Sequence, residues 1–194
     1  SKGKWERTAH VYDGESLRVP VGAGVAAASI RVAYRAVPRR GLYFLAPDEH
    51  VPHRPKQVWT QCQDEDARHI FPCHDKPHVK QTTEARVTVP AGWSVLSNGV
   101  LVEQHKNGKG VFHWKMEEPH PSYLFTLVAG EFDRIEDDAG GATAQAVGHV
   151  GAEREGDGCE GFGAEIEFPE GVEAGEGSGG VTGAACEARG DGDA

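Results

Sequence analysis

The sequence predicts an all-β fold built mostly from antiparallel strands. Two observations support this: short segments in which apolar and polar residues alternate, and turn residues that separate these segments. Many short strands joined by turns are typical of an antiparallel sandwich or a curved sheet. A chain of 194 residues is long enough for one ordinary domain with a sizeable core.

The first strands are expected before residue 50. Residues 29–37 place Ile, Val, Tyr and Ala at every second position between Arg and Ala residues, which is the period of a half-buried strand. Residues 41–45, Gly-Leu-Tyr-Phe-Leu, form a short apolar run directly after a Pro-Arg-Arg-Gly turn. Residues 64–70 are the one stretch that indicates a helical turn.

The later strands follow one another closely. Residues 83–90 alternate and stop at a proline, and residues 94–99 end in Asn-Gly, a strong signal for a β-hairpin with residues 100–105 as the return strand. A Lys-Asn-Gly-Lys-Gly turn precedes further strands at 111–116 and 123–132, where Trp114, like Trp93 before it, is expected in the core.

Charge divides the chain near residue 136. Residues 1–136 carry 18 Lys and Arg against 16 Asp and Glu, whereas residues 137–194 carry 2 basic and 14 acidic residues. The second segment also holds 16 of the 26 glycines, and its Val, Ile and Phe total only 7 of 58 residues. Such a composition cannot bury enough apolar surface to offset the entropy lost on ordering, so we expect a disordered tail. Two origins stay open: a true acidic linker, or GC-rich DNA translated out of frame.

One segment, residues 57–77 (QVWTQCQDEDARHIFPCHDKP), is unusually rich in functional side chains. It has two glutamines on either side of a cysteine, four acidic residues, an arginine and two histidines. With the strands that follow, it resembles the N-terminal domain of the aminopeptidase N family of zinc metallopeptidases. The resemblance rests on a Q-x-Q/E-x-x-x-A-R-x-x-x-P-C-x-D-x-P signature followed by a strand and Leu-Ser-Asn, and it covers about residues 10–136. The matching positions are Gln61, Gln63, Ala67, Arg68, Phe71, Pro72, Cys73, Asp75 and Pro77.

This resemblance implies a saddle-shaped, mostly antiparallel β-sandwich, here lacking its first strands, packed on a thermolysin-like catalytic domain. The parent enzyme removes N-terminal residues from peptides and uses zinc to activate water. The sequence contains neither the zinc motif H-E-x-x-H nor the G-x-M-E-N loop. We therefore expect the chain alone to hold no catalytic zinc and to be inactive, with the catalytic domain and a peptide N-terminus as its partners.

The resemblance also implies roles within the loop. Gln63, and Glu65 two residues on, are the candidates for binding the substrate's free α-amine, because a protonated amine needs several converging acceptors. Apart from the resemblance, Arg68 and Asp75 flank His-Ile-Phe-Pro-Cys, so a turn there is expected to bring them together as an ion pair that holds the loop. Pro72 and Pro77 are expected to fix the chain's path, and Cys73 to be a small buried residue. Asp64 and Asp66 are expected to be surface acids.

Alternatives exist for several of these residues. Cys62 and Cys73 would form a disulfide only in an oxidising compartment. His69, His74 and His78 are spaced like metal ligands, but Pro77 argues against a helix that would align two of them. The chain as a whole could instead be a non-catalytic binding module with an acidic tether.

Other classes of function have little support in the sequence. No basic, aromatic-rich stripe indicates nucleic-acid binding. No apolar run approaches the length of a membrane span or a signal peptide, which favours a cytoplasmic protein.

Overall fold

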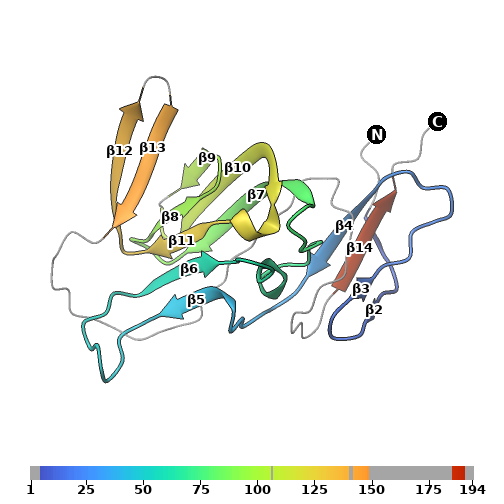
Figure 1. Cartoon of the computed structure of the whole chain (residues 1–194), viewed down its shortest axis with the longest axis horizontal. Helices are drawn as coiled ribbons and strands as arrows, with labels where there is room; N and C mark the ends of the chain where they lie inside the picture. The colour runs from blue at the N-terminus through green and yellow to red at the C-terminus, as the bar shows by residue number, and fades with distance from the viewer. Residues whose placement is uncertain (1–4, 106, 140–141, 149–184, 191–194) are drawn as a thin grey trace.

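The computed structural model describes residues 5–105, 107–139, 142–148 and 185–190 (Figure 1). In this part of the chain every element is a strand except two 3-10 helices, η1 (Ala67–His69) and η2 (Ser122–Leu124), and every strand pair is antiparallel. This confirms the predicted all-β, antiparallel fold. None of the helices described is long and apolar enough to cross a membrane.

A four-stranded sheet forms one layer of the core. Its strands, in spatial order, are β5 (Gly41–Leu45), β6 (Gln57–Gln61), β11 (Leu127–Gly130) and β8 (Ser94–Ser97). The register places Val58 opposite Ala129 and Ala129 opposite Val95, so these three side chains share one face. All three are almost completely buried, which identifies this face as the inner one.

A three-stranded sheet forms the second layer, with β10 (Gly110–Pro121) between β7 (Lys80–Val89) and β9 (Val100–His105). Val87 and Phe112 lie opposite each other in this sheet and are fully buried. Residues from both sheets form one core cluster, which also contains Phe71 and Phe125 in edge-on contact with their ring centroids 5.0 Å apart. Trp114 belongs to this cluster and Trp93 packs against it, as expected.

The predicted hairpin at Asn98–Gly99 is wrong. β8 pairs with β11 and β9 pairs with β10, so the turn carries the chain from one sheet to the other. The Asn98 side chain donates to the Leu124 carbonyl oxygen (3.0 Å) and accepts from the Thr126 N–H (2.6 Å), which ties the turn to the end of η2 and to the segment that follows it. Gly99 has φ +81°, and a Cβ there would lie 2.0 Å from the Lys115 carbonyl oxygen. Glycine is therefore required for the crossing, while the true hairpin joins β9 to β10.

Short strands and two further pairings complete the described structure. β2 pairs with β3, β12 pairs with β13, and β14 lies between β1 and β4. These elements are β1 (Glu6–Arg7), β2 (Val11–Tyr12), β3 (Leu17–Arg18), β4 (Ala28–Ala33), β12 (Asp133–Ala139), β13 (Ala142–Gly148) and β14 (Ala185–Gly190).

The expected disordered tail falls mostly on residues outside the described part of the chain. The two segments described beyond residue 139 are the strands β13 and β14, and β12 itself continues past residue 136. The division into domains 1–136 and 137–194 stays a prediction.

Candidate functional site

The loop between β6 and β7 forms the candidate site, and its first turn exposes Gln63. β6 ends at Gln61, and the chain then turns sharply, with the Asp66 N–H donating to the Cys62 carbonyl oxygen (2.9 Å). Gln63 and Asp64 are exposed on this turn, which leads directly into η1. The helical turn expected in residues 64–70 is therefore a tight turn followed by one turn of 3-10 helix.

The base of the turn packs directly on β5. Gly41, the first residue of β5, has φ +80°, and a Cβ there would lie 2.3 Å from the Asp66 carbonyl oxygen. On the other side of the loop, the Tyr34 hydroxyl donates to the Ile70 carbonyl oxygen at 2.6 Å. Backbone contact with β5 and a hydrogen bond from the segment after β4 thus hold the loop in place.

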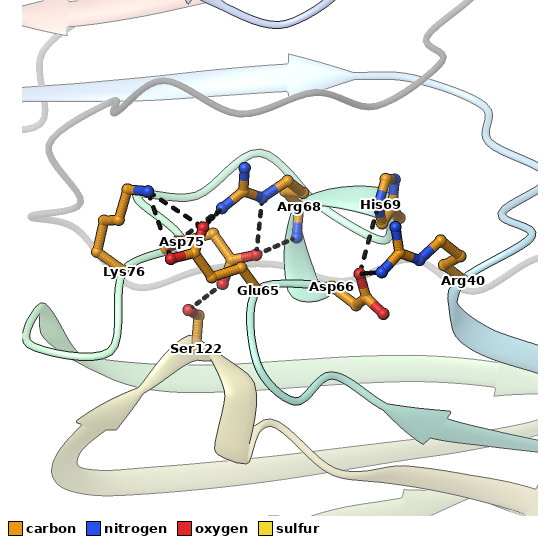
Figure 2. Close-up of polar contacts among 8 residues, drawn as sticks. All are labelled: Arg40, Glu65, Asp66, Arg68, His69, Asp75, Lys76 and Ser122. Atoms are coloured by element: carbon orange, nitrogen blue, oxygen red, sulfur yellow. Dashed lines mark hydrogen bonds and ion pairs between the residues drawn. The ribbon is translucent and has the colours of Figure 1, made fainter.

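Asp75 is the centre of the polar contacts behind the turn (Figure 2). Its side chain is 1% exposed, and its Oδ2 accepts from the backbone N–H (3.0 Å) and the Nε (3.2 Å) of Arg68. Arg68 Nη2 also donates to the Asp75 carbonyl oxygen at 2.9 Å. The structure therefore brings together the two residues that were expected to brace the loop.

Ser122 completes the contacts of Asp75. Its hydroxyl, on η2, donates to the Asp75 Oδ1 that Arg68 does not use, and Ser122 is itself 1% exposed. The buried carboxylate therefore joins three parts of the chain: η1, the segment before β7 and η2. Sequence reasoning missed Ser122 because 47 residues separate it from Asp75 and no local pattern links them.

Glu65 lies between two cations. Arg68 Nη2 donates to its Oε2, and Lys76 Nζ lies 3.1 Å from Oε2 and 3.4 Å from Oε1 (Figure 2). The hydrogen bond from Lys76 is the main cause that lowers the pKa of the Glu65 carboxyl, and Arg68 adds to it. The candidate amine-binding carboxylate thus already holds a primary ammonium, that of Lys76.

Asp66 lies in a buried position that the sequence did not predict. It was expected to be a surface acid, but it is 8% exposed, and its Oδ1 lies 3.0 Å from Arg40 Nη2 and 3.6 Å from His69 Nε2. Burial follows from the close packing of the loop on Gly41, next to Arg40. Asp64 is exposed, as expected.

Both cysteines of the loop are buried and free. Burial raises the pKa of the Cys62 thiol to about 12, and it raises the pKa of the Cys73 thiol as well. The disulfide considered for this pair is absent, and Cys73 has the expected place in the core cluster, while Pro72 before it is exposed.

The described residues do not fit a metal site. No group of three or more His, Cys, Asp or Glu side chains in this part of the chain could hold an ion. His69 contacts Asp66 instead. His69, His74 and His78 are spaced along the sequence like metal ligands, but they form no metal-binding group in the described part of the chain.

The comparisons with known proteins identify the class to which this fold and loop belong. The family model of the peptidase M1 N-terminal domain matches residues 3–124. Because the match covers more than half of the chain, the chain belongs to this family.

Several aminopeptidases are similar to the chain. Rat aminopeptidase B is 34% identical over 107 residues, which are 55% of this chain and 16% of that protein. Leucine aminopeptidase 2 of Aspergillus terreus is 35% identical over 95 residues (46% and 15%). Leukotriene A-4 hydrolase of Xenopus laevis is 39% identical over 80 residues (39% and 13%). The chain therefore spans less than a fifth of the length of these relatives.

Solved structures of an M1 zinc metallopeptidase from Deinococcus radiodurans are also similar. One, an E323A mutant with a Tyr-Ser-Ala substrate, matches with a TM-score of 0.44 and 22% identity, over 62% of this chain and 36% of that chain.

Proposed function

We propose that this chain acts as the N-terminal domain of a zinc aminopeptidase, which removes N-terminal residues from peptides, and that its loop after β6 binds the substrate's free α-amine. The membership of the M1 N-terminal family supports the first part. Relatives named as aminopeptidases support the reaction class. No such support exists for the alternative of a non-catalytic binding module.

The amine-binding part of the proposal rests on the exposed turn at Gln63. This turn leads into η1, which is held by the buried contacts among Arg68, Asp75 and Ser122. The side-chain carbonyl oxygen of Gln63 can accept a hydrogen bond from an ammonium group. Its turn is closed by the hydrogen bond between Asp66 and Cys62, and η1 behind it is held by the buried Asp75. A fixed turn loses little conformational entropy when a ligand binds, so an exposed acceptor on it is well suited to recognition.

Glu65 is the second acceptor of the proposed site. Its carboxylate adds a negative charge two residues from Gln63, and a hydrogen bond between charged groups is stronger than one between neutral groups. The free amine is the group that distinguishes an aminopeptidase substrate from an internal peptide bond. In this proposal the two side chains provide that distinction.

Zinc chemistry would come from a catalytic domain and not from this loop. Among the described residues there is no group of three or more His, Cys, Asp or Glu side chains that could hold a metal ion. The proposed contribution of the chain is therefore limited to binding and orientation. The thermolysin-like catalytic domain is its proposed partner.

The amine-binding role can be tested by NMR titration of this chain with L-leucinamide and N-acetyl-L-leucinamide. We expect the free amine to shift the backbone amide signals of residues 62–66 and the acetylated probe to leave them unchanged. Gln63→Ala should abolish or strongly weaken the response. Asp64→Asn, a change on the same exposed turn, is the control and should retain it. Equal responses to both probes, or a response that survives Gln63→Ala, would remove Gln63 from the site.

A further inference from the structure

We propose that Lys76 is a built-in competitor of the substrate: its ammonium occupies the position at Glu65 that a peptide's α-ammonium would take, and so limits how tightly the loop binds free amines. This inference rests on the proposed amine-binding function of the loop. It assigns to Lys76 a role in affinity that neither the family signature nor the sequence pattern indicated.

Lys76 and the N-terminus of a peptide present the same chemical group to Glu65. The side chain of lysine ends in a primary ammonium with three N–H donors, as does the N-terminus of a peptide. Lys76 Nζ lies 3.1 Å from Oε2 and 3.4 Å from Oε1 of Glu65, so it contacts both carboxylate oxygens. An incoming α-ammonium would seek the same oxygens.

The two cations that contact Glu65, Arg68 and Lys76, differ in how firmly they are held (Figure 2). Arg68 is 19% exposed and is fixed by three hydrogen bonds to Asp75, so it cannot leave without breaking the buried brace. Lys76 is 45% exposed, and its ammonium contacts Glu65. Ion pairs between exposed side chains contribute little because water and salt screen them. Lys76 is thus the cation that a ligand can displace, whereas Arg68 keeps the carboxylate oriented.

Displacement of Lys76 would make Oε1 of Glu65 available to a ligand. Arg68 donates to Oε2 of Glu65, whereas Lys76 reaches both Oε2 and Oε1. When Lys76 moves away, Oε1 loses its contact while Arg68 still holds Oε2. Glu65 and Gln63 belong to the same short turn, so both acceptors of the proposed site are carried by one segment.

The experiment uses the whole chain and compares Lys76→Gln with Lys80→Gln. Both variants remove one positive charge, but Lys80, at the start of β7, is exposed and makes no contact with Glu65 in the structure. The probes are L-leucinamide and N-acetyl-L-leucinamide, and the readout is the Kd from NMR shifts of residues 62–66. We expect Lys76→Gln to lower the Kd for L-leucinamide about two- to fivefold, the range that an exposed ion pair allows. Lys80→Gln should leave the Kd unchanged.

Two further variants separate displacement from a general charge effect. Lys76→Arg keeps the charge and should bind L-leucinamide no more tightly than the wild type. Adding Glu65→Gln to Lys76→Gln should cancel the gain, because the carboxylate that the amine would use is gone. A gain that persists in this double variant, or one that Lys80→Gln reproduces, would overturn the inference.

The outcomes also separate this inference from the proposed function. If wild type and Lys76→Gln bind the free amine equally and Gln63→Ala abolishes binding, the loop binds amines but Lys76 does not compete, and only the inference fails. If neither chain distinguishes the free amine from its acetylated form, the amine-binding role of the loop fails together with the inference.

Discussion

Asp75 and Glu103 both contact arginine side chains, but they differ in how far water reaches them. Asp75, in the loop before β7, is 1% exposed and contacts Arg68, which is 19% exposed. Glu103, on the edge strand β9, is 44% exposed and lies 3.8 Å from Arg86, which is 42% exposed. Glu103 also contacts His105 at 2.6 Å.

The difference in burial determines what each contact can do. At Glu103 both partners are hydrated before and after folding, so the contact adds little to stability. At Asp75 the charge has left water, and it is compensated by the N–H and Nε of Arg68 and by the hydroxyl of Ser122. Removing one partner there leaves buried polar groups without compensation. We therefore expect the Asp75 cluster to hold the candidate site in shape and the Glu103 cluster to be replaceable.

The largest effect is expected for Asp75→Ala. It leaves the backbone N–H and the Nε of Arg68 and the hydroxyl of Ser122 without the acceptor that they share, so the free energy of unfolding should fall by about 3 kcal/mol. Asp75→Asn retains one oxygen that can face Arg68 and should cost about half as much. Chemical denaturation with urea measures both values. If Asp75→Ala lowers the free energy of unfolding no more than the removal of an exposed acidic side chain does, Asp75 does not brace the loop.

A smaller effect is expected for Ser122→Ala, which removes one hydrogen bond to a charged acceptor without changing the volume much. The expected loss is about 1–2 kcal/mol. Ser97→Ala is the matched control, because Ser97 is also buried but donates to a neutral carbonyl oxygen, that of Thr126 at 2.6 Å. It should cost less.

The coupling between Ser122 and Asp75 tests whether they act as one cluster. The double variant Ser122→Ala with Asp75→Asn should lose less stability than the two single variants combined, because both remove parts of the same network. Simple additivity would show that Ser122 and Asp75 contribute independently. Urea denaturation of the four proteins completes this cycle.

The same comparison shows what could be predicted from the sequence. Alternation and turn residues predicted the antiparallel strands, and the placement of Arg68 and Asp75 on either side of His-Ile-Phe-Pro-Cys predicted their contact. The hairpin at Asn98–Gly99 failed because an Asn-Gly turn has the same local signal whether the chain returns or crosses to another sheet. Here the bonds from Asn98 to the end of η2 and to the segment that follows it decide the direction.

Two residues that contact the site, Ser122 and Arg40, were not predicted from the sequence. Their partners lie far away in the sequence or across a packed surface. Ser122 reaches Asp75 from η2, and Arg40 reaches Asp66 from the turn before β5. The burial of Asp66 likewise depends on how closely the loop packs on Gly41. Tertiary contacts of this kind leave no periodic signal, so alternation and turn chemistry cannot reveal them.

The smallest effect is expected for Glu103→Gln, and its pH dependence sharpens the comparison. Contact with His105, and secondarily with Arg86, lowers the pKa of the Glu103 carboxyl below its ordinary value of 4.5. A lowered pKa in the folded state means that any stabilisation is present above the ordinary pKa and is lost as the pH falls through the folded pKa. Because the side chain is exposed, Glu103→Gln should change the denaturation midpoint only slightly at pH 7, and the change should vanish at a pH well below the folded-state pKa. A loss at pH 7 as large as that of Asp75→Ala would show that burial does not separate the two clusters, and that the edge strand depends on its surface charges as strongly as the loop depends on its brace.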